Sequence, residues 1–135
     1  MAASSALSRH HPRSLRFHSS RMAPSVVAVD VHGDVDASNA DDLMRYVTQA
    51  CKSRDDLVLD LRGVTFFGTH GFTALLQAKD GGAVVVPSPV VDRVLELCDP
   101  ESRVLVAADV DAAVSMLKRR LRPALHFVTR LPKRF

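Results

Sequence analysis

The stretch Leu57-Val58-Leu59-Asp60-Leu61 decides the fold. It is a short, largely apolar run, preceded by the polar Arg54-Asp55-Asp56 and followed closely by Gly63. Runs of this length that end at turn-forming residues are typical of strands buried on both faces, as in a parallel sheet. The stretch therefore predicts a central strand in an α/β fold.

Strands and helices are expected to alternate on both sides of this central strand. The expected strands cover residues 14–19, 25–31, 57–61, 83–86 and 103–107, and the expected helices cover residues 39–52, 70–78, 89–98 and 110–121. This order predicts a single-layer, mostly parallel sheet of about five strands flanked by four helices. The first two strands are expected to pair as an N-terminal edge hairpin.

Local signals set the expected ends of these elements. Small polar side chains at N-caps accept hydrogen bonds from the first turn of a helix, and the residues in these positions are Ser38, Thr69, Ser88 and Asp109. His32-Gly33-Asp34 is expected to end the second strand. Pro123 is expected to end the last helix, because proline lacks a backbone N–H.

The net charge of +3 conceals an uneven distribution. Residues 1–24 hold four Arg, residues 118–135 hold seven Lys or Arg, and neither segment has an acid, whereas residues 25–117 carry a net charge of −8. We expect a flexible basic N-terminal tail (1–13), one acidic domain (14–121) and a basic C-terminal extension (122–135). A transit peptide, or a translation start at Met22, is the alternative for the N-terminal segment.

Composition and motifs exclude several classes of function. The acidic middle is a poor match for nucleic-acid phosphates, and no stretch reaches the roughly 20 apolar residues of a membrane span, so neither is expected as a partner. No metal-ligand spacing, phosphate loop or hydrolase motif occurs, which predicts no metal, no cofactor and no catalytic residues. Cys51 and Cys98 lie on apolar helical stripes and are expected to be buried thiols, with a redox pair as the alternative.

Five motifs occur in one order along the chain. They are Gly33-Asp34-Val35-Asp36, the segment from Leu57 to Phe66, Gly71-Phe72-Thr73-Ala74-Leu75-Leu76, Gly81-Gly82, and the segment from Val86 to Leu97 with its Pro87-Ser88-Pro89. Together they resemble the STAS domain of anti-sigma factor antagonists, over about residues 14–121. The resemblance implies a cytoplasmic bacterial regulator that acts by binding. Its implied partner is an anti-sigma factor, commonly a serine kinase as well, which releases a sigma factor when it is captured.

The phosphorylation motif of that family is altered in this chain. In the family the kinase phosphorylates a serine in Asp-Ser-Ser-Gly at the start of the second helix, and the matching residues here are Gly68-Thr69-His70-Gly71. His70 takes the place of the phosphorylated serine, and only Thr69 offers a hydroxyl. We therefore expect an antagonist without the usual serine phosphorylation, with Thr69 as the possible phosphorylation site. The second helix is also expected to be shorter than in family members.

The resemblance and the expected strand ends together nominate a partner-binding surface. Its residues are Asp36, Ser38, Asn39, Gly68, Thr69, His70, Gly71 and Phe72. Each has a simpler interpretation as well: Asp36 as a turn acid, His70 as an exposed residue without a role, and Phe72 as part of the core. The oligomeric state is expected to be a monomer or a weak homodimer.

Two other functions remain open from the sequence. A small-ligand or nucleotide sensor on the same fold is the alternative, because ligands of α/β sheets bind beyond the carboxyl ends of the strands. Asp60 ends a central strand as the phospho-acceptor of a two-component receiver does, and Asp30 and Asp34 could imitate the receiver's acidic pair. No Lys directly follows residues 104–108, however, and Lys118 lies at the far end of a helix, so the simpler role of Asp60 is to hold the turn at Gly63. An enzyme is the least favoured possibility.

Overall fold

The computed structural model describes residues 15–128 and the side chains of residues 15–120. The elements are β2 (Arg16–Ala23), β3 (Val26–Val35), α1 (Ala40–Cys51), β4 (Asp56–Phe67), the 3₁₀ helix η2 (Thr69–Gly71), α2 (Phe72–Asp80), β5 (Val84–Val86), α3 (Pro89–Cys98), β6 (Leu105–Val106) and α4 (Val110–Val128). Five strands and four α-helices alternate as the sequence predicts.

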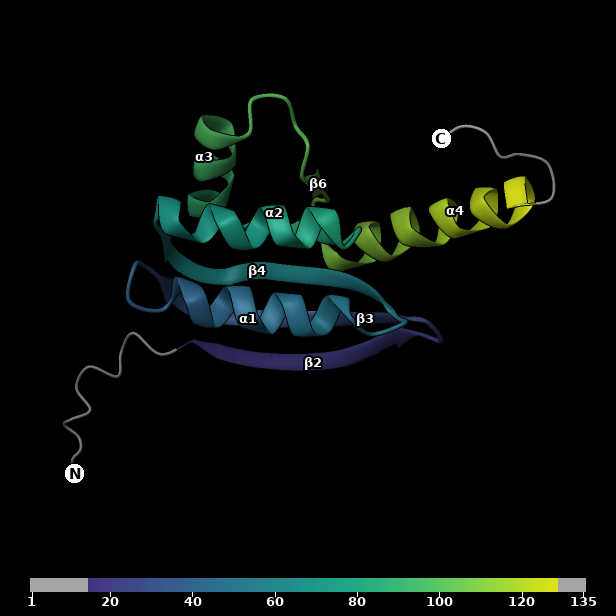
Figure 1. Cartoon of the computed structure of the whole chain (residues 1–135), viewed down its shortest axis with the longest axis horizontal. Coiled ribbons are helices and arrows are strands. Elements are labelled where there is room, and N and C mark those ends of the chain that lie inside the picture. The colour runs from purple at the N-terminus through teal and green to yellow at the C-terminus, as the bar shows by residue number, and fades with distance from the viewer. Residues whose placement is uncertain (1–14, 129–135) are drawn as a thin grey trace.

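The strands form one sheet in the order β2-β3-β4-β5-β6 (Figure 1). β2 and β3 pair antiparallel through a turn at Pro24-Ser25, whereas all the other neighbours are parallel. The predicted N-terminal edge hairpin and the mostly parallel sheet are therefore confirmed. The carboxyl ends of β3, β4 and β5 lie at the same end of the sheet, as parallel pairing requires.

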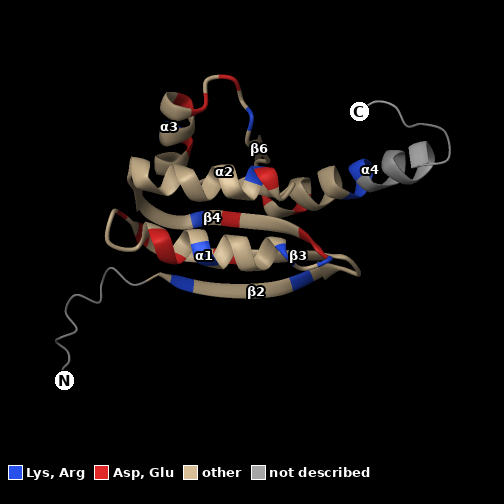
Figure 2. Cartoon of the chain, viewed as in Figure 1, with Lys and Arg blue, Asp and Glu red and all other residues tan. Residues whose placement is uncertain are grey.

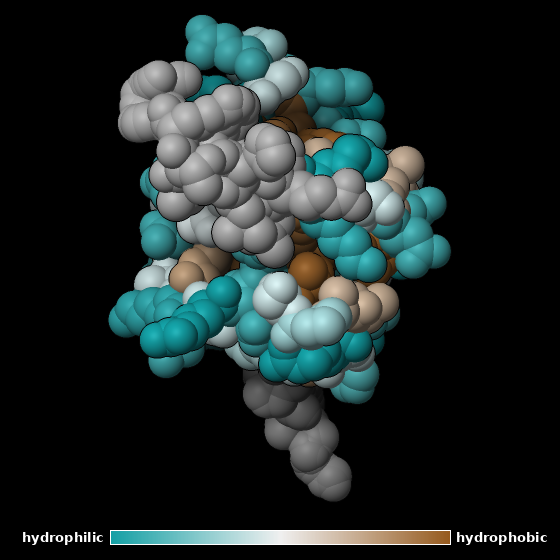
Figure 3. All heavy atoms as spheres, turned by 90° about the vertical axis from the view of Figure 1, so that its right-hand side faces the viewer, coloured by the Kyte–Doolittle hydropathy of each residue, from teal (hydrophilic) through white to brown (hydrophobic). Residues whose placement is uncertain are grey.

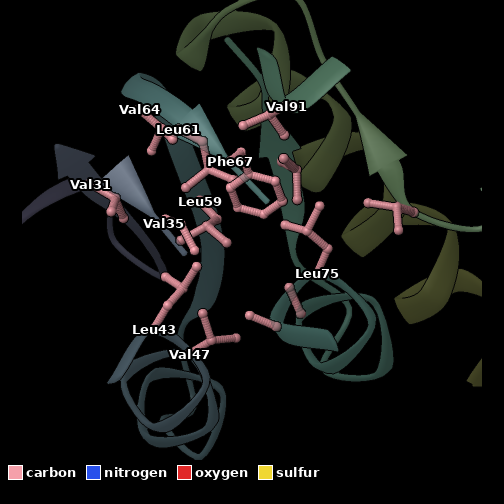
Figure 4. Packing of buried hydrophobic residues seen from close by; sticks show 14 of the residues in the cluster. Val31, Val35, Leu43, Val47, Leu59, Leu61, Val64, Phe67, Leu75 and Val91 are labelled. Carbon is pink, nitrogen blue, oxygen red and sulfur yellow. The ribbon is translucent and has the colours of Figure 1, made fainter. Parts of the chain in front are cut away.

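Alternating side chains of the strands divide the core between the two faces of the sheet. Leu57, Leu59 and Leu61 belong to the larger cluster, which packs beneath α1, α2 and α3 (Figure 4). Val58 belongs to a second cluster, in which Leu117 of α4 packs on the opposite face. Strands covered on both faces explain why residues 57–61 are almost uninterrupted apolar sequence.

The central strands are longer than the sequence predicts. β3 continues to Val35 and β4 to Phe67, so the prediction that His32-Gly33-Asp34 ends a strand is wrong. The pairing of β3 with β4 shifts between Asp30 and His32 and again between Gly33 and Asp34, and then continues. Gly33 has a positive φ of 124°, and a Cβ on Gly63 would come within 2.2 Å of His32 Nδ1. These glycines accommodate irregularities inside the strands and do not end them.

Two of the expected helix caps are confirmed and two are wrong. Ser88 accepts a hydrogen bond from the Val91 N–H at 3.4 Å, and Asp109 accepts one from the Ala112 N–H at 2.7 Å. The N-cap of α1 is Asn39, one residue after Ser38, and the N-cap of α2 is Gly71, so neither Ser38 nor Thr69 caps its helix.

The last helix also differs from the expectation, because α4 continues through Pro123 to Val128. A proline inside a helix removes one backbone hydrogen bond, and the residues after it, Ala124-Leu125-His126-Phe127, are compatible with helix.

None of the helices in the part of the chain that the structure describes has the length and apolar character needed to cross a membrane. On the face shown in Figure 3, hydrophilic side chains surround a smaller hydrophobic area.

Candidate functional site

The two segments nominated from the sequence meet at the carboxyl ends of β3 and β4. Val35 and Phe67, the last residues of these strands, are paired in register, and the Gly68 N–H donates to the Val35 carbonyl at 2.9 Å. The β3–α1 loop and the start of α2 are therefore neighbours (Figure 1). We call this surface, made of residues 34–39 and 65–72, the sheet-end corner.

Asp36 shapes the loop on one side of the sheet-end corner. Its Oδ1 accepts from the Ser38 N–H at 2.9 Å and from the Ser38 hydroxyl at 2.6 Å. Its carbonyl accepts from the N–H groups of Asn39 and Ala40, at 3.2 and 2.9 Å. Asp36 is half-buried and Ser38 is exposed. The interpretation of Asp36 as a turn acid thus agrees with the structure, and the carboxylate still lies at the surface of the loop.

The buried side chain of Asn39 fixes the same loop through hydrogen bonds to its backbone. Only 4% of this residue is exposed. Its Oδ1 accepts from the Asp36 N–H at 2.9 Å, and its Nδ2 donates to the Asp34 carbonyl at 2.8 Å. A side chain buried in this way positions the loop, and the expected role of Asn39 in partner binding stays a prediction.

The segment from Gly68 to Phe72 supplies the other side of the sheet-end corner. Thr69 and His70 are exposed at the start of the 3₁₀ helix. Gly71 is buried, and a Cβ on it would come within 2.5 Å of the Phe67 ring, so only glycine fits without movement. Phe72 is half-buried and packs against the larger core cluster, in agreement with its simpler interpretation as a core residue.

Phe66 and Thr65 are among the residues of the sheet-end corner that were not nominated from the sequence. Phe66 is 51% exposed, and a Cβ on Gly68 would lie 3.6 Å from its ring. Thr65 donates its hydroxyl to Asp34 Oδ1 at 2.6 Å and so ties β4 to β3. The sequence could have indicated the exposure of Phe66 only if β4 were known to continue past Gly63, because adjacent residues of a strand face opposite sides and Phe66-Phe67 cannot both be buried by the same helices.

The sequence of this chain matches the model of a known domain family. The model of the STAS domain matches residues 19–113, which is most of the chain. The chain belongs to the STAS domain family. No curated protein matches its sequence at a significant level.

Solved structures with the same fold include several anti-sigma factor antagonists. The antagonist from Mycobacterium paratuberculosis is 23% identical, with a TM-score of 0.70, over 79% of this chain and 97% of that one. A protein assigned as an antagonist from Thermotoga maritima is 17% identical, with a TM-score of 0.63, over 82% and 99%. The antagonist SpoIIAA in its unphosphorylated form is 14% identical, with a TM-score of 0.54, over 80% and 97%. At these identities the likeness shows the fold.

Asp60 of this STAS domain is engaged in a structural ion pair. The residue is 6% exposed and accepts from Arg62 three times, from Nε at 3.0 Å, from Nη2 at 3.0 Å and from the backbone N–H at 3.1 Å. Burial alone would raise the pKa of Asp60, but the hydrogen bonds and charge of Arg62 outweigh it and hold the pKa below its usual value. This arrangement fits the turn-holding role expected for Asp60.

The described residues around Asp60 do not form a metal site. Asp30 lies opposite Asp60 in the register of β3 and β4, and its carboxylate is 3.6 Å from His32 Nε2. Among residues 15–120, no three His, Cys, Asp or Glu side chains are grouped so that they could hold a metal ion.

The two cysteines of the STAS domain are free thiols. Cys51 ends α1 and lies against the end of α2, where a Cβ on Gly81 would come within 2.4 Å of its Sγ. Burial raises the pKa of the Cys51 thiol, which makes it less reactive. Cys51 and Cys98 are both partly buried and pack against the larger core cluster. Their expected role as packed thiols agrees with this arrangement, and the redox pair stays a prediction.

Proposed function

We propose that this STAS domain is an anti-sigma factor antagonist that captures an anti-sigma factor through the sheet-end corner and so releases a sigma factor. Membership of the family, and a fold shared with several antagonists, support the general role. The observation that supports this surface is the meeting of the β3–α1 loop with the start of α2, in a segment where Phe66, Thr69 and His70 are exposed.

Binding at the sheet-end corner would cost little ordering. The loop is already fixed by Asn39 and Ser38, and the start of α2 is fixed by the packing of Gly71 on Phe67. A surface that is rigid before association loses less conformational entropy when it binds. Phe66 would act as the apolar anchor, because exposed aromatic rings surrounded by polar groups dominate many protein interfaces.

The proposed antagonist works by binding and without the usual serine phosphorylation. Thr69 supplies the only hydroxyl of Gly68-Thr69-His70-Gly71 and is exposed at the start of the 3₁₀ helix. A phosphate on Thr69 would stand one residue before the position at which the family carries it. We propose that the chain acts in the cytoplasm as a monomer or weak homodimer, bound to neither nucleic acid nor membrane, and that Thr69 stays unmodified.

The experiment is capture of the anti-sigma factor from the native cell, followed by a measured affinity with the purified partner. Phe66→Ala is the test variant, and we expect at least a tenfold loss of affinity. Leu97→Ala is its matched control, because Leu97 is also an exposed apolar side chain (73%) but lies on α3, and we expect no change. Equal affinities for wild type and Phe66→Ala would contradict the proposed surface.

Two further measurements test the remaining parts of the proposal. The mass of the intact protein purified from native cells should show no added phosphate. A phosphate on Thr69 would contradict the proposal that the protein acts without phosphorylation. If nucleotides raise the melting temperature of the protein and no anti-sigma factor is captured, the result would contradict the antagonist function and support a ligand-sensing STAS domain.

A further inference from the structure

The strand β6 lies at an edge of the sheet and presents part of its backbone there. In the part of the chain that the structure describes, β6 is the last strand of the sheet and pairs only with β5. The Ala107 N–H donates to the Val85 carbonyl at 2.9 Å. In a parallel pair, successive residues direct their backbone groups to opposite sides of the strand, so Val106 directs its N–H and carbonyl away from β5.

The preceding outward-facing residue supports this alternation. Val104 also directs its N–H away from β5, and Asp99 Oδ2 accepts from that N–H at 2.9 Å. The loop before β6 thus covers the backbone of Val104 with a carboxylate. No described strand lies beyond β6 to pair with Val106, so its backbone can pair with an added strand.

A groove of about 690 Å³ lies along this edge. Its lining includes Leu95 of α3, Met116 of α4 and the strand residues Leu105 and Val106, and we call it the β6 groove. Leu105 and Val106 are 38% and 41% exposed. α3 packs on the face of the sheet that holds the larger core cluster, whereas α4 packs on the opposite face. The β6 groove is therefore a sheet edge between two helices (Figure 1).

The two sides of the β6 groove differ in charge. On the α3 side, Asp92 and Glu96 are exposed and lie one helical turn apart. Neither carboxylate forms an ion pair with a described residue, whereas Asp99 is paired with Arg103 at 3.2 Å. Figure 2 shows the acidic residues of α3 and of the loop after it. On the α4 side the lining residue is the apolar Met116, and no Lys or Arg of the described chain lines the groove.

We propose that an extended segment of another protein, in which Lys or Arg alternates with apolar residues, pairs with β6 through the backbone of Val106. Successive side chains of an added strand point to opposite faces of the sheet. Basic side chains on the α3 face would meet Asp92 and Glu96, and apolar side chains on the α4 face would meet Met116. Backbone hydrogen bonds hold such a segment, and the side-chain alternation selects it.

The charge of the β6 groove favours this occupant over a second copy of the chain. Antiparallel pairing of two β6 strands about a two-fold axis would place α3 of both copies on the same face. Asp92 and Glu96 of one copy would then face the same acids of the other, and like charges oppose association. None of the residues that line the groove belongs to the sheet-end corner, so the inference goes beyond the proposed function and does not depend on it.

Titration of the ¹⁵N-labelled protein with synthetic peptides tests the site without an anti-sigma factor. The probe is acetyl-Lys-Val-Lys-Leu-Lys-Val-Lys-amide. Its control is the isomer acetyl-Lys-Lys-Lys-Lys-Val-Leu-Val-amide, which keeps the charge and composition but not the alternation. We expect the probe to shift the amide resonances of residues 92–96 and 104–107 and to bind about tenfold more tightly than the isomer. An unshifted spectrum, or equal affinities for the two peptides, would overturn the proposal.

Two variants separate the backbone contact from the charge. Val106→Pro removes the outward N–H and should abolish binding of the probe, since a sheet edge tolerates proline where the nitrogen faces outward. Asp92→Asn/Glu96→Gln should weaken binding about tenfold at low salt, and this variant decides the test if Val106→Pro does not fold. The matched control is Asp41→Asn/Asp42→Asn, which removes two exposed acids from the first turn of α1 and should leave the affinity unchanged. An equal loss of affinity in the control would overturn the site.

Sedimentation of the peptide-free protein tests the competing occupant. Wild type and Val106→Pro should have the same oligomeric state, because the proposed segment comes from a different protein. A dimer that forms in wild type and is lost in Val106→Pro would show that β6 pairs with a second copy, and would overturn the proposed occupant.

Discussion

The backbone N–H of Gly68 donates to the carbonyl of Val35 at 2.9 Å, and this bond joins the two halves of the sheet-end corner. It extends the pairing of β3 and β4 by one step beyond Val35 and Phe67. Because the bond is made by backbone groups, it depends on the conformation of residue 68 more than on its side chain. The start of α2 is thereby placed beside the β3–α1 loop.

Glycine is required at residue 71 and is dispensable at residue 68. A Cβ on Gly71 would come within 2.5 Å of the Phe67 ring, whereas the nearest atom to a Cβ on Gly68 is 3.6 Å away. Gly68 also has an ordinary φ of −79°. Gly71→Ala should therefore lower the free energy of unfolding by about 1–3 kcal/mol, because Phe67 must move within a packed core.

Gly68→Ala is the matched control in the same segment. Its stability should stay within about 1 kcal/mol of wild type, since alanine adopts this conformation without strain. Urea unfolding followed by circular dichroism measures both variants. If Gly71→Ala proved as stable as Gly68→Ala, the packing of residue 71 on Phe67 would be wrong.

Asn39 is expected to contribute more to stability than its exposed neighbour Ser38. Asn39→Ala leaves the Asp36 N–H and the Asp34 carbonyl without the side-chain partners that they have at 2.9 and 2.8 Å. Buried polar groups that lose a partner cost about 1–3 kcal/mol each, so we expect a loss of about 2–3 kcal/mol and weaker capture of the anti-sigma factor. Ser38→Ala removes only exposed hydrogen bonds and should cost less than about 1 kcal/mol. Equal losses for the two variants would argue against the positioning role of Asn39.

The sequence was sufficient for the order of the elements and insufficient for their ends. The alternation of apolar strands with amphipathic helices predicts the sheet, and Ser88 followed by Pro89 marks the start of α3. Two adjacent polar residues compete to cap α1, and the choice of Asn39 over Ser38 depends on contacts with Asp34 that a local pattern does not contain. The lengths of β3 and β4 depend likewise on how His32 packs over Gly63.

The sequence likewise predicts only part of the candidate site. The sequence places Asp36 and Thr69 at two strand ends, and parallel pairing then brings them together. The exposure of Phe66 was missed because it depends on β4 continuing past Gly63, which local signals predict as its end.

Asp99 should make the protein sensitive to acid. Its Oδ2 accepts from the Val104 N–H at 2.9 Å and its Oδ1 from the Arg103 N–H at 3.0 Å, in a buried position. The hydrogen bond from Val104, reinforced by Arg103, holds the pKa of Asp99 below its usual value despite the opposing effect of burial. A carboxyl whose pKa is lower in the folded state stabilises the protein above its unfolded pKa of about 3.9, and this contribution is lost as the pH falls through the folded pKa.

Asp99→Asn tests this pH dependence. The amide that replaces Oδ2 cannot accept from Val104, so we expect a loss of about 1–3 kcal/mol at pH 7. Below about pH 4 the gap to wild type should narrow, because wild type loses its own contribution there. Asp92→Asn, on the exposed first turn of α3, should change stability little at any pH. Parallel stability curves for wild type and Asp99→Asn across this range would be the contrary result.

The strand β2 is part of the fold, so a chain that began at Met22 should be severely destabilised. Such a chain would lack Arg16 to Arg21, six of the seven residues that β2 pairs with β3, and would leave β3 as the edge. It would also lose Phe17, whose ring stacks on Tyr46 with centroids 4.1 Å apart. Because whole domains are stable by only about 5–15 kcal/mol, this loss should leave little cooperative unfolding in urea. A chain lacking residues 1–13 keeps all of β2, so its free energy of unfolding should lie within about 0.5 kcal/mol of that of the full chain. Phe17→Ala should lower the free energy of unfolding by about 2 kcal/mol, a loss between those of the two truncated chains. A cooperative transition of unchanged midpoint in the chain from Met22 would show that β2 is dispensable.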